Sequence, residues 1–383
     1  MKKILFVSHE YNIGGSSVSL LNLIEGMQKC SNQSMKIDVL IPRGGNVHKQ
    51  ARDLFLMHNV SCKEMLYRHN FKLLNKKKTI INYLHDIWNL LSVLKIFLLI
   101  KRGDYDILCS NSTGVDVGAR AAKIARIPHI FYVREFMEKD HGFEYRNKSR
   151  MKKLLEESEY CIFISKAIQD YYCNKYKLKS TIQFYDGFMI EDYYICNHGI
   201  LCNSSISFVQ VGYFSDGKGT LNTIMLLQKL KERGIDNWTL ELIGDGSEEY
   251  VSKMKKFIKE YHLEGQVIIG EFATDIKGIL DSKDILIMNS RAEGFGRVTI
   301  EGMLAGCLVI GRNAGGTAEI MTNRVNGITF DDEEQFLKVV QDIYKDRKYY
   351  RELAQRGQEY ALEKSDCVNV AKKFIEVVEK CLI

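Results

Sequence analysis

The sequence predicts an α/β protein with two doubly wound, parallel-sheet domains that face a central cleft. Short apolar runs alternate with amphipathic stretches along the chain, and strands that alternate with helices form parallel sheets from βαβ units. The alternation breaks at residues 188–204, which show neither a helical nor a strand period, and then starts afresh. These observations predict a first domain over 1–187, a linker over 188–204 and a second domain over 205–383.

The predicted elements follow one another in each half. We expect strands of the first domain at 3–8, 36–42, 106–112, 129–135 and 160–165, with helices at 17–29, 79–101, 115–126 and 148–158. We expect strands of the second domain at 205–212, 238–244, 266–271, 284–290 and 307–312, followed by a helical stretch over roughly 332–381. A chain of 383 residues with 45% hydrophobic residues can fill both cores.

Charge is distributed unevenly between the two halves. Residues 1–195 carry 30 Lys and Arg against 20 Asp and Glu, a net charge of +10, whereas residues 196–383 carry 24 against 28, a net charge of −4. A basic first half indicates an anionic partner. No nucleic-acid motif accompanies the charge, so we expect no nucleic acid. An anionic membrane surface or a phosphorylated acceptor fits the charge as well.

Cysteine usage and the first residues indicate a cytoplasmic protein. The ten cysteines include no C-x-x-C pair, and the apolar run after Met1 ends at Ser8–Glu10, where a signal peptide would continue. We therefore expect reduced thiols and no metal cluster.

The stretch EGFGRVTIEGMLAG, residues 293–306, contains the most informative motif. Glycine is costly inside a helix and suits tight turns, so Gly294 and Gly296 predict a loop that leads into a helix from about Arg297. The first N–H groups of a helix lack partners within the helix and attract phosphate. With Glu293 at the rim and Glu301 one turn inside, this is a predicted site for a molecule with phosphate and hydroxyl groups.

Three further segments end a predicted strand with a glycine-rich loop that opens a helix, at 8–24, 211–224 and 311–321. In the first, Gly14 to Ser17 would let an anion approach the start of the helix. In the second, Lys218 adds a point charge suited to phosphate. Taken alone, a tight turn with an N-cap explains the first loop, and a solvated lysine explains the second.

Residues 87–100 form the one stretch that resembles a membrane segment. The stretch is shorter than the ~20 apolar residues that span a bilayer, and Lys95 interrupts it. We favour a buried helix that leads into the strand at 106–112. The alternative is an interfacial patch, which is helped by a preceding basic run, Lys72, Lys76, Lys77 and Lys78.

Together these motifs resemble the family-4 retaining glycosyltransferases, whose GT-B fold consists of two Rossmann-like domains with a nucleotide-sugar in the cleft between them. The markers occur in the family order: the N-terminal GG loop, VGYFSDGKG, LIGDGSEE, EGFGRVTIEGMLAG and GGTAEI. The resemblance covers nearly the whole chain. FYVREF and FGRVTIEGMLAG resemble members that build bacterial capsule, O-antigen or exopolysaccharide.

The resemblance implies transfer of a sugar from a nucleotide-sugar donor, such as a UDP-sugar, to a glycan or lipid-linked acceptor. The anomeric configuration would be retained, no metal or other cofactor would be required, and the enzyme would work in the cytoplasm or as a peripheral protein on the inner membrane face. Two alternatives stay open: a non-catalytic GT-B-like subunit that supports another glycosyltransferase, and a nucleotide-sugar epimerase.

The family match also implies the roles of individual residues. Glu293 and Lys218 would be catalytic, with Glu293 beside the transferred sugar and Lys218 at the diphosphate. Glu301 would bind the ribose hydroxyls. The full set implied in donor binding is Gly15, Ser16, Tyr213, Gly244, Gly246, Phe272, Ala273, Phe295, Gly296, Arg297, Val298 and Glu301. No metal ligand is implied.

The sequence departs from the family pattern at two places. Tyr213 stands where the family usually has an arginine, so the phosphate clamp lacks one cation, and Arg297 is a candidate to replace it. A histidine common after the first-domain strand YVREF is also absent. Arg134 and Glu135 occupy that neighbourhood and are candidates for the acceptor side.

Overall fold

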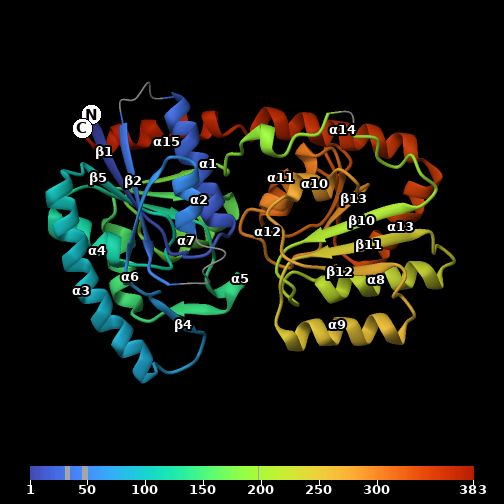
Figure 1. Ribbon diagram of the computed structural model, residues 1–383, viewed down its shortest axis with the longest axis horizontal. Helices are drawn as coiled ribbons and strands as arrows, with labels where there is room; N and C mark the ends of the chain where they lie inside the picture. The colour runs from blue at the N-terminus through green and yellow to red at the C-terminus, as the bar shows by residue number, and fades with distance from the viewer. Residues whose placement is uncertain (31–34, 45–50, 197) are drawn as a thin grey trace. The chain divides into compact units, whose positions relative to one another are not determined.

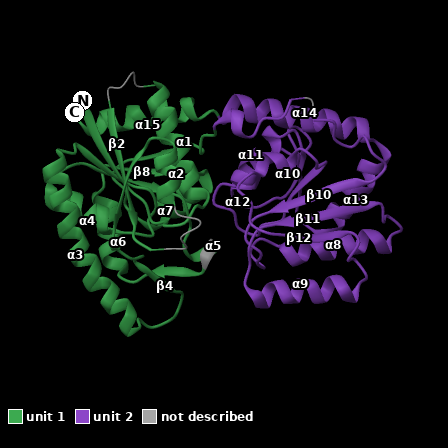
Figure 2. Cartoon of the chain, viewed as in Figure 1, with its two compact units in different colours: residues 1–188, 366–383 green, residues 189–365 purple. Residues whose placement is uncertain are grey.

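Two parallel sheets carry the fold (Figure 1). The computed structural model describes residues 1–30, 35–44, 51–196 and 198–383. Its chain divides into unit 1, residues 1–188 with 366–383, and unit 2, residues 189–365 (Figure 2). Unit 1 contains a seven-stranded sheet of order β3-β2-β1-β5-β6-β8-β9, and unit 2 contains a six-stranded sheet of order β12-β11-β10-β13-β14-β15. The predicted pair of doubly wound parallel sheets is therefore present.

Helices and strands alternate through unit 1. Its main sheet consists of β1 (Lys2–Val7), β2 (Met35–Pro42), β3 (Ser61–Met65), β5 (Ile107–Ser110), β6 (His129–Val133), β8 (Tyr160–Phe163) and β9 (Thr181–Gln183), while β4 (Phe71–Leu73) and β7 (Phe143–Tyr145) form a separate antiparallel pair. Its helices are α1 (Gly15–Cys30), α2 (Ala51–Met57), α3 (Ile80–Gly103), α4 (Val117–Ala125), α5 (Glu138–His141), α6 (Lys148–Glu157), α7 (Lys166–Lys175) and α15 (Cys367–Cys381).

Unit 2 repeats the pattern. Its strands are β10 (Ile206–Val211), β11 (Trp238–Ile243), β12 (Val267–Gly270), β13 (Ile285–Met288), β14 (Leu308–Arg312) and β15 (Ile328–Phe330). Its helices are the short 3₁₀ turn η1 (Ile190–Asp192), α8 (Thr220–Glu232), α9 (Glu248–Glu260), α10 (Ile276–Leu280), α11 (Arg297–Leu304), α12 (Gly315–Ile320), α13 (Glu333–Lys345) and α14 (Arg347–Lys364). Every predicted strand of both halves is found, and the strands that the sequence missed are short.

The C-terminal helix corrects the predicted domain boundary. Residues 366–383 belong to unit 1, not to the second domain that was expected over 205–383. The apolar face of α15 packs on α1, where Gly26 approaches so closely that an added Cβ would lie 2.5 Å from the Cys367 carbonyl oxygen. Phe374 is buried and its ring lies 5.6 Å from that of Phe6 in β1. A helical period identifies an apolar face but does not say which sheet that face covers.

The expected linker is also part of a folded unit. Residues 189–204 lie in unit 2, where Ile200 and Leu201 join the hydrophobic core. The Leu201 N–H donates a hydrogen bond to the Asp284 carboxylate just before β13. The segment lacks a period because it is anchored by individual side chains and backbone groups.

Helix α3 contradicts the favoured interpretation of residues 87–100 as a buried helix. Its inward face is buried and includes Val93, Ile96 and Ile100, which pack in the core of unit 1. Its outward face carries Leu91 and Leu94, which are exposed to about half their area, at 53% and 50%. The helix is therefore apolar on both faces, and only one of them is covered.

We predict that Phe374→Ala destabilises unit 1 by ~3–5 kcal/mol, because the change removes a fully buried ring and leaves a cavity. Urea unfolding followed by hydrogen-exchange mass spectrometry should show loss of protection in β1 and α1, while β10 to β14 keep theirs. Lys373→Ala, at the exposed neighbouring position, is the control and should leave both units unchanged. Loss of protection confined to unit 2 would contradict the assignment of α15.

Candidate functional site

The site is determined by a reversal of strand order in the sheet of unit 2. Strand β10 pairs with β11 on one side and with β13 on the other. The chain runs outward from β10 through β11 to β12 and then returns to β13. The loops after β10 and β13 therefore leave the sheet in opposite directions, and ligands of open α/β sheets bind at such a point.

Lys218 and Glu293 meet at this point. Lys218 lies in the loop after β10, Glu293 lies in the loop after β13, and the Lys218 Nζ donates a hydrogen bond to Glu293 Oε2 over 2.7 Å. Gly219 ends the first loop at φ 66°, and an added Cβ would lie 2.4 Å from the Asn289 carbonyl oxygen. Because only glycine fits there, the lysine loop is held against the end of β13.

The predicted loop-to-helix junction is confirmed. Helix α11 begins at Arg297, and its N-cap is Gly296 at φ 91°. Next to it, the Gly316 N–H donates a hydrogen bond of 2.8 Å to the Glu293 carbonyl oxygen, so the start of α12 lies beside the same loop. Two helix starts therefore converge on the residues that follow Glu293.

Two buried threonines at this junction were not identified from the sequence. An added Cβ on Gly296 would lie 3.2 Å from the hydroxyl oxygens of both Thr299 and Thr317. Both hydroxyls are buried and have no hydrogen-bond partner among the described residues. An unpaired buried hydroxyl costs free energy, which is the pattern expected where a polar ligand completes the bonding. Both residues lie inside the quoted motifs, but their burial could not be predicted from spacing.

Glu301 is buried one turn into α11. Burial raises the pKa of its carboxyl, and the Arg297 guanidinium opposes that rise. The Arg297 Nη2 lies 3.5 Å from Glu301 Oε1 and 3.4 Å from the Tyr193 hydroxyl oxygen. Burial raises the pKa of Tyr193 to about 12, so this group stays a neutral phenol. Arg297 thus faces Glu301. The sequence did not identify Tyr193 as a site residue, because it lies in the aperiodic stretch 188–204.

The remaining donor-site candidates of unit 2 follow β10, β11 and β12 or lie at the start of α11 and in the loop just before it. Gly244 follows β11 at φ 156°, where an added Cβ would lie 2.0 Å from the Gly212 carbonyl oxygen. Gly246 forms a bridge with Phe214. Tyr213 is 57% exposed. Of the others, Phe272 is exposed, Ala273 and Val298 are partly buried and Phe295 is buried.

In unit 1, a carboxylate already accepts a hydrogen bond from the glycine-rich loop at the start of α1. Helix α1 begins at Gly15, and the Ser17 N–H donates a hydrogen bond of 2.9 Å to Glu10 Oε2. Gly15 is exposed, and the Ser16 hydroxyl is buried with no hydrogen-bond partner among the described residues. An anion that reached this helix start would have to displace the Glu10 carboxylate.

Arg134 and Glu135, the acceptor-side candidates, are both buried. Arg134 donates to Asn111 Oδ1 from Nε and to Asp186 Oδ1 from Nη1, each over 2.7 Å. Glu135 Oε1 accepts hydrogen bonds from the N–H and the hydroxyl of Thr113, over 2.9 and 2.7 Å. These side chains brace the loop after β5, and neither is presented on the surface.

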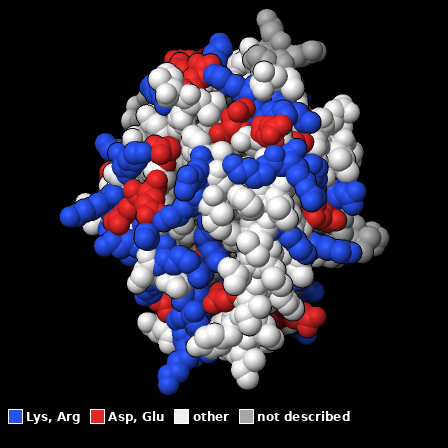
Figure 3. All heavy atoms as spheres, turned by 90° about the vertical axis from the view of Figure 1, so that its left-hand side faces the viewer, with Lys and Arg blue, Asp and Glu red and all other residues white. Residues whose placement is uncertain are grey.

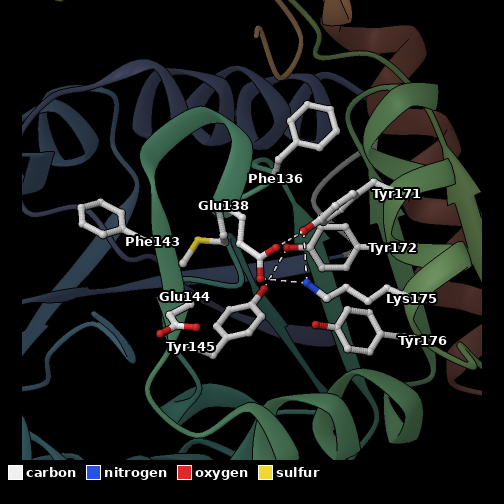
Figure 4. A pocket seen from close by; sticks show the side chains of 10 residues that line it. Phe136, Glu138, Phe143, Glu144, Tyr145, Tyr171, Tyr172, Lys175 and Tyr176 are labelled. Carbon is white, nitrogen blue, oxygen red and sulfur yellow. Dashed lines mark hydrogen bonds and ion pairs between the residues drawn. The ribbon is translucent and has the colours of Figure 1, made fainter. Parts of the chain in front are cut away.

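A small pocket beyond these residues is lined by aromatic rings (Figure 4). Its space is about 10 Å³, enough for roughly one water molecule. Lys175 Nζ and the Tyr171 hydroxyl each donate a hydrogen bond of 2.9 Å to the carboxylate of Glu138. The rim is therefore closed by paired groups, and the pocket is too small for a sugar ring.

Two family models match the chain, one in each half. The model described as Glycosyltransferase Family 4 matches residues 13–183, and the model described as Glycosyl transferases group 1 matches residues 203–360. The second match includes Lys218, Glu293 and Glu301. The two matches together cover most of the sequence, in the order of the two units.

Two curated relatives are similar to parts of the chain. An uncharacterized 41.2 kDa protein in the cps region of Klebsiella pneumoniae is 24% identical over 73% of this chain and 82% of its own length. The lipopolysaccharide core biosynthesis glycosyltransferase LpsD of Rhizobium meliloti is 30% identical over 32% of this chain and 34% of its own.

Among solved structures, HepE (Alr3699) of Anabaena in complex with UDP has a TM-score of 0.79 at 20% identity, over 99% of this chain and 100% of that one. The same protein in complex with UDP-glucose gives a TM-score of 0.78 at the same identity and coverage. At such identity the likeness establishes the fold. With its two family matches, its two Rossmann-like units and its motif order, the chain belongs to the family-4 glycosyltransferases of GT-B fold.

Proposed function

We propose that this glycosyltransferase moves a sugar from a nucleoside-diphosphate sugar to a glycan or lipid-linked acceptor, with retention and without a metal, in the synthesis of a bacterial cell-surface polysaccharide. The observation that carries the proposal is the Lys218–Glu293 pair at the strand-order reversal, beside the start of α11. A cation, the start of a helix and a buried carboxylate lie there in one unit, which suits phosphate and hydroxyl groups together.

The donor would be held by groups of unit 2. Glu301, as a carboxylate, accepts hydrogen bonds from the two ribose hydroxyls, and Arg297 and Tyr193 fix its orientation. The diphosphate lies at the start of α11, where the unpaired hydroxyls of Thr299 and Thr317 are available. HepE, which has been solved with UDP and with UDP-glucose, supports a nucleotide of this class, since its chain has the same fold.

The chemistry requires charge stabilisation at the leaving group. When the bond between the anomeric carbon and the diphosphate breaks, negative charge grows on the phosphate oxygens, and Lys218 and the helix N–H groups stabilise it. The acceptor hydroxyl attacks from the same face, its proton passes to the leaving phosphate oxygen, and the configuration is retained. Lys218 exchanges its contact with Glu293 for the phosphate, and Glu293 becomes free to accept from a sugar hydroxyl.

The second candidate function is a non-catalytic subunit of another glycosyltransferase. Tyr213 favours it, since an exposed tyrosine stands where a phosphate-binding arginine is usual.

The polysaccharide setting is supported by the relatives, one described in lipopolysaccharide core biosynthesis and one in a cps region. We propose that the enzyme acts in the cytoplasm, or on the inner face of the membrane, because the proposed donor is a nucleotide-sugar.

We expect slow hydrolysis of a UDP-, GDP- or dTDP-sugar in the absence of acceptor, with release of a sugar whose anomeric configuration matches the donor. Proton NMR recorded before mutarotation measures the configuration, and Lys218→Ala should abolish the signal. Release of the inverted anomer would contradict retention. A changed epimer would indicate the epimerase, and no turnover with any donor would favour the subunit.

We predict that Lys218→Ala and Glu301→Ala each weaken nucleotide binding at least tenfold, because a lost charge-assisted hydrogen bond costs ~1.5–3 kcal/mol. Isothermal calorimetry measures the affinity and circular dichroism checks the fold. Lys253→Ala on α9, an exposed lysine of the same unit, is the matched control. Unchanged affinity in both site variants would refute the donor site.

We predict that nucleotide binding weakens as the pH falls from neutral. The raised pKa of Glu301 means that its carboxylate takes up a proton at a higher pH than an ordinary glutamate, and a neutral carboxyl accepts the ribose hydroxyls poorly. Below the pKa the affinity should fall by about tenfold per pH unit. The Glu301→Gln protein should bind the nucleotide more weakly at neutral pH and should lack this pH dependence. Parallel pH profiles of affinity for the two proteins would contradict the role of Glu301.

A further inference from the structure

Helix α3 presents an uncovered apolar stripe that the transfer reaction does not use. Residues that recur every three or four positions share one face of a helix. The outward stripe follows this spacing through Ile80, Leu84, Ile87, Leu91, Leu94 and Leu98. These side chains are exposed to between 45% and 81% of their area. A contiguous exposed apolar patch of this kind marks a binding surface.

Basic side chains accompany the stripe. From Lys72 to Gly103 the sequence has seven Lys and Arg and one Asp, a net charge of 7 − 1 = +6, equal to the net charge of the whole chain. Lys76 and Lys77 lie exposed just before the helix and Lys95 lies exposed within it. Figure 3 shows this side of unit 1 as a band of uncharged atoms with Lys and Arg on both flanks.

The acid in this segment is already neutralised. Asp86 accepts the Lys78 ammonium at 3.2 Å and the Arg146 guanidinium at 3.0 Å. Lys72 is likewise paired with Glu144. The charge that the outward face presents is therefore positive, and it comes from lysines beside the stripe rather than from these paired groups.

By length and composition α3 is the single helix among the described residues that could cross a bilayer, but its inward contacts argue against spanning. The Asn89 side chain accepts from the Arg68 N–H and donates to the Arg68 carbonyl oxygen, each over 2.8 Å. Val93 and Ile96 are buried in the core of unit 1. Crossing the bilayer would break these contacts, so the helix keeps its inward face on the protein.

We propose that α3 is a membrane-docking helix, which lies in the plane of an anionic lipid surface with its apolar stripe among the acyl chains and its lysines at the headgroups. Interfacial helices combine an apolar face with flanking Lys and Arg and enter the bilayer by about 5–10 Å. The stripe and the basic flanks together fit this occupant, because an apolar protein partner would leave the lysines uncompensated. The proposal does not depend on the transfer reaction.

The test is co-sedimentation of the full chain with vesicles of phosphatidylglycerol and phosphatidylcholine at low salt. We expect binding that falls as salt rises and that is absent with phosphatidylcholine alone. Lys76→Gln, Lys77→Gln and Lys95→Gln combined should weaken binding at least about tenfold. The matched control is Lys253→Gln, Lys255→Gln and Lys256→Gln on α9, which should bind as the parent does.

The apolar stripe needs a separate variant. Ile87→Gln, Leu91→Gln and Leu94→Gln combined change exposed positions, so the fold should persist by circular dichroism while vesicle binding falls at least about tenfold. Binding that survives this variant would refute insertion of the stripe. Concentration-dependent self-association that this variant abolishes, together with no vesicle binding by the parent, would instead identify a second copy of the chain as the occupant and overturn the proposal.

Trp88 offers a direct measure of depth. The chain has two tryptophans: Trp88 on α3 is 38% exposed, and Trp238 in the core of unit 2 is 2% exposed. Lipids brominated on their acyl chains should quench the emission of Trp88 and spare that of Trp238, so Trp88→Phe should remove the quenching. Vesicle binding without any quenching would show contact through headgroups alone and would contradict an inserted helix.

Discussion

The strand-order reversal between β10 and β13 is the constraint on which the site depends. It brings Lys218 and Glu293, which lie 75 residues apart in the sequence, within 2.7 Å. A partly exposed ion pair contributes little to folding stability, so its position follows from the topology. The sheet fixes both strand ends, the glycine at 219 admits the lysine loop, and Gly296 turns the chain into α11. The pair therefore holds the Lys218 ammonium in place before a ligand binds.

Local signals made much of the fold predictable. Apolar runs located every long strand, and the cost of glycine inside a helix located the start of α11 at Arg297. The short strands β3 and β9 were missed because edge strands are stabilised by a neighbour on one side, so their sequences need not be continuously apolar. The roles of Glu293 and Glu301 came from the family resemblance. Spacing in the sequence could not show that Lys218 contacts Glu293, because the two residues lie in different loops.

Long-range contacts explain what the sequence did not reveal. Arg134 and Glu135 follow a predicted strand, and nothing in their neighbourhood indicates that Arg134 pairs with Asp186, 52 residues away, inside the protein. The period of α3 is weak because its residues are apolar on both faces, so the sequence could not separate the face that packs from the face that does not. Tyr193 was missed because it lies in an aperiodic stretch whose structure depends on unit 2.

The division of the chain into units has a consequence for its synthesis. Unit 1 begins at residue 1 and is completed only by residues 366–383, so the whole of unit 2 is inserted within it. On the ribosome, α1 emerges early and keeps its surface for α15 uncovered until residues 366–383 have left the exit tunnel. Unit 2 has all its strands by then and can fold first, so the first unit to be made is the last to be finished.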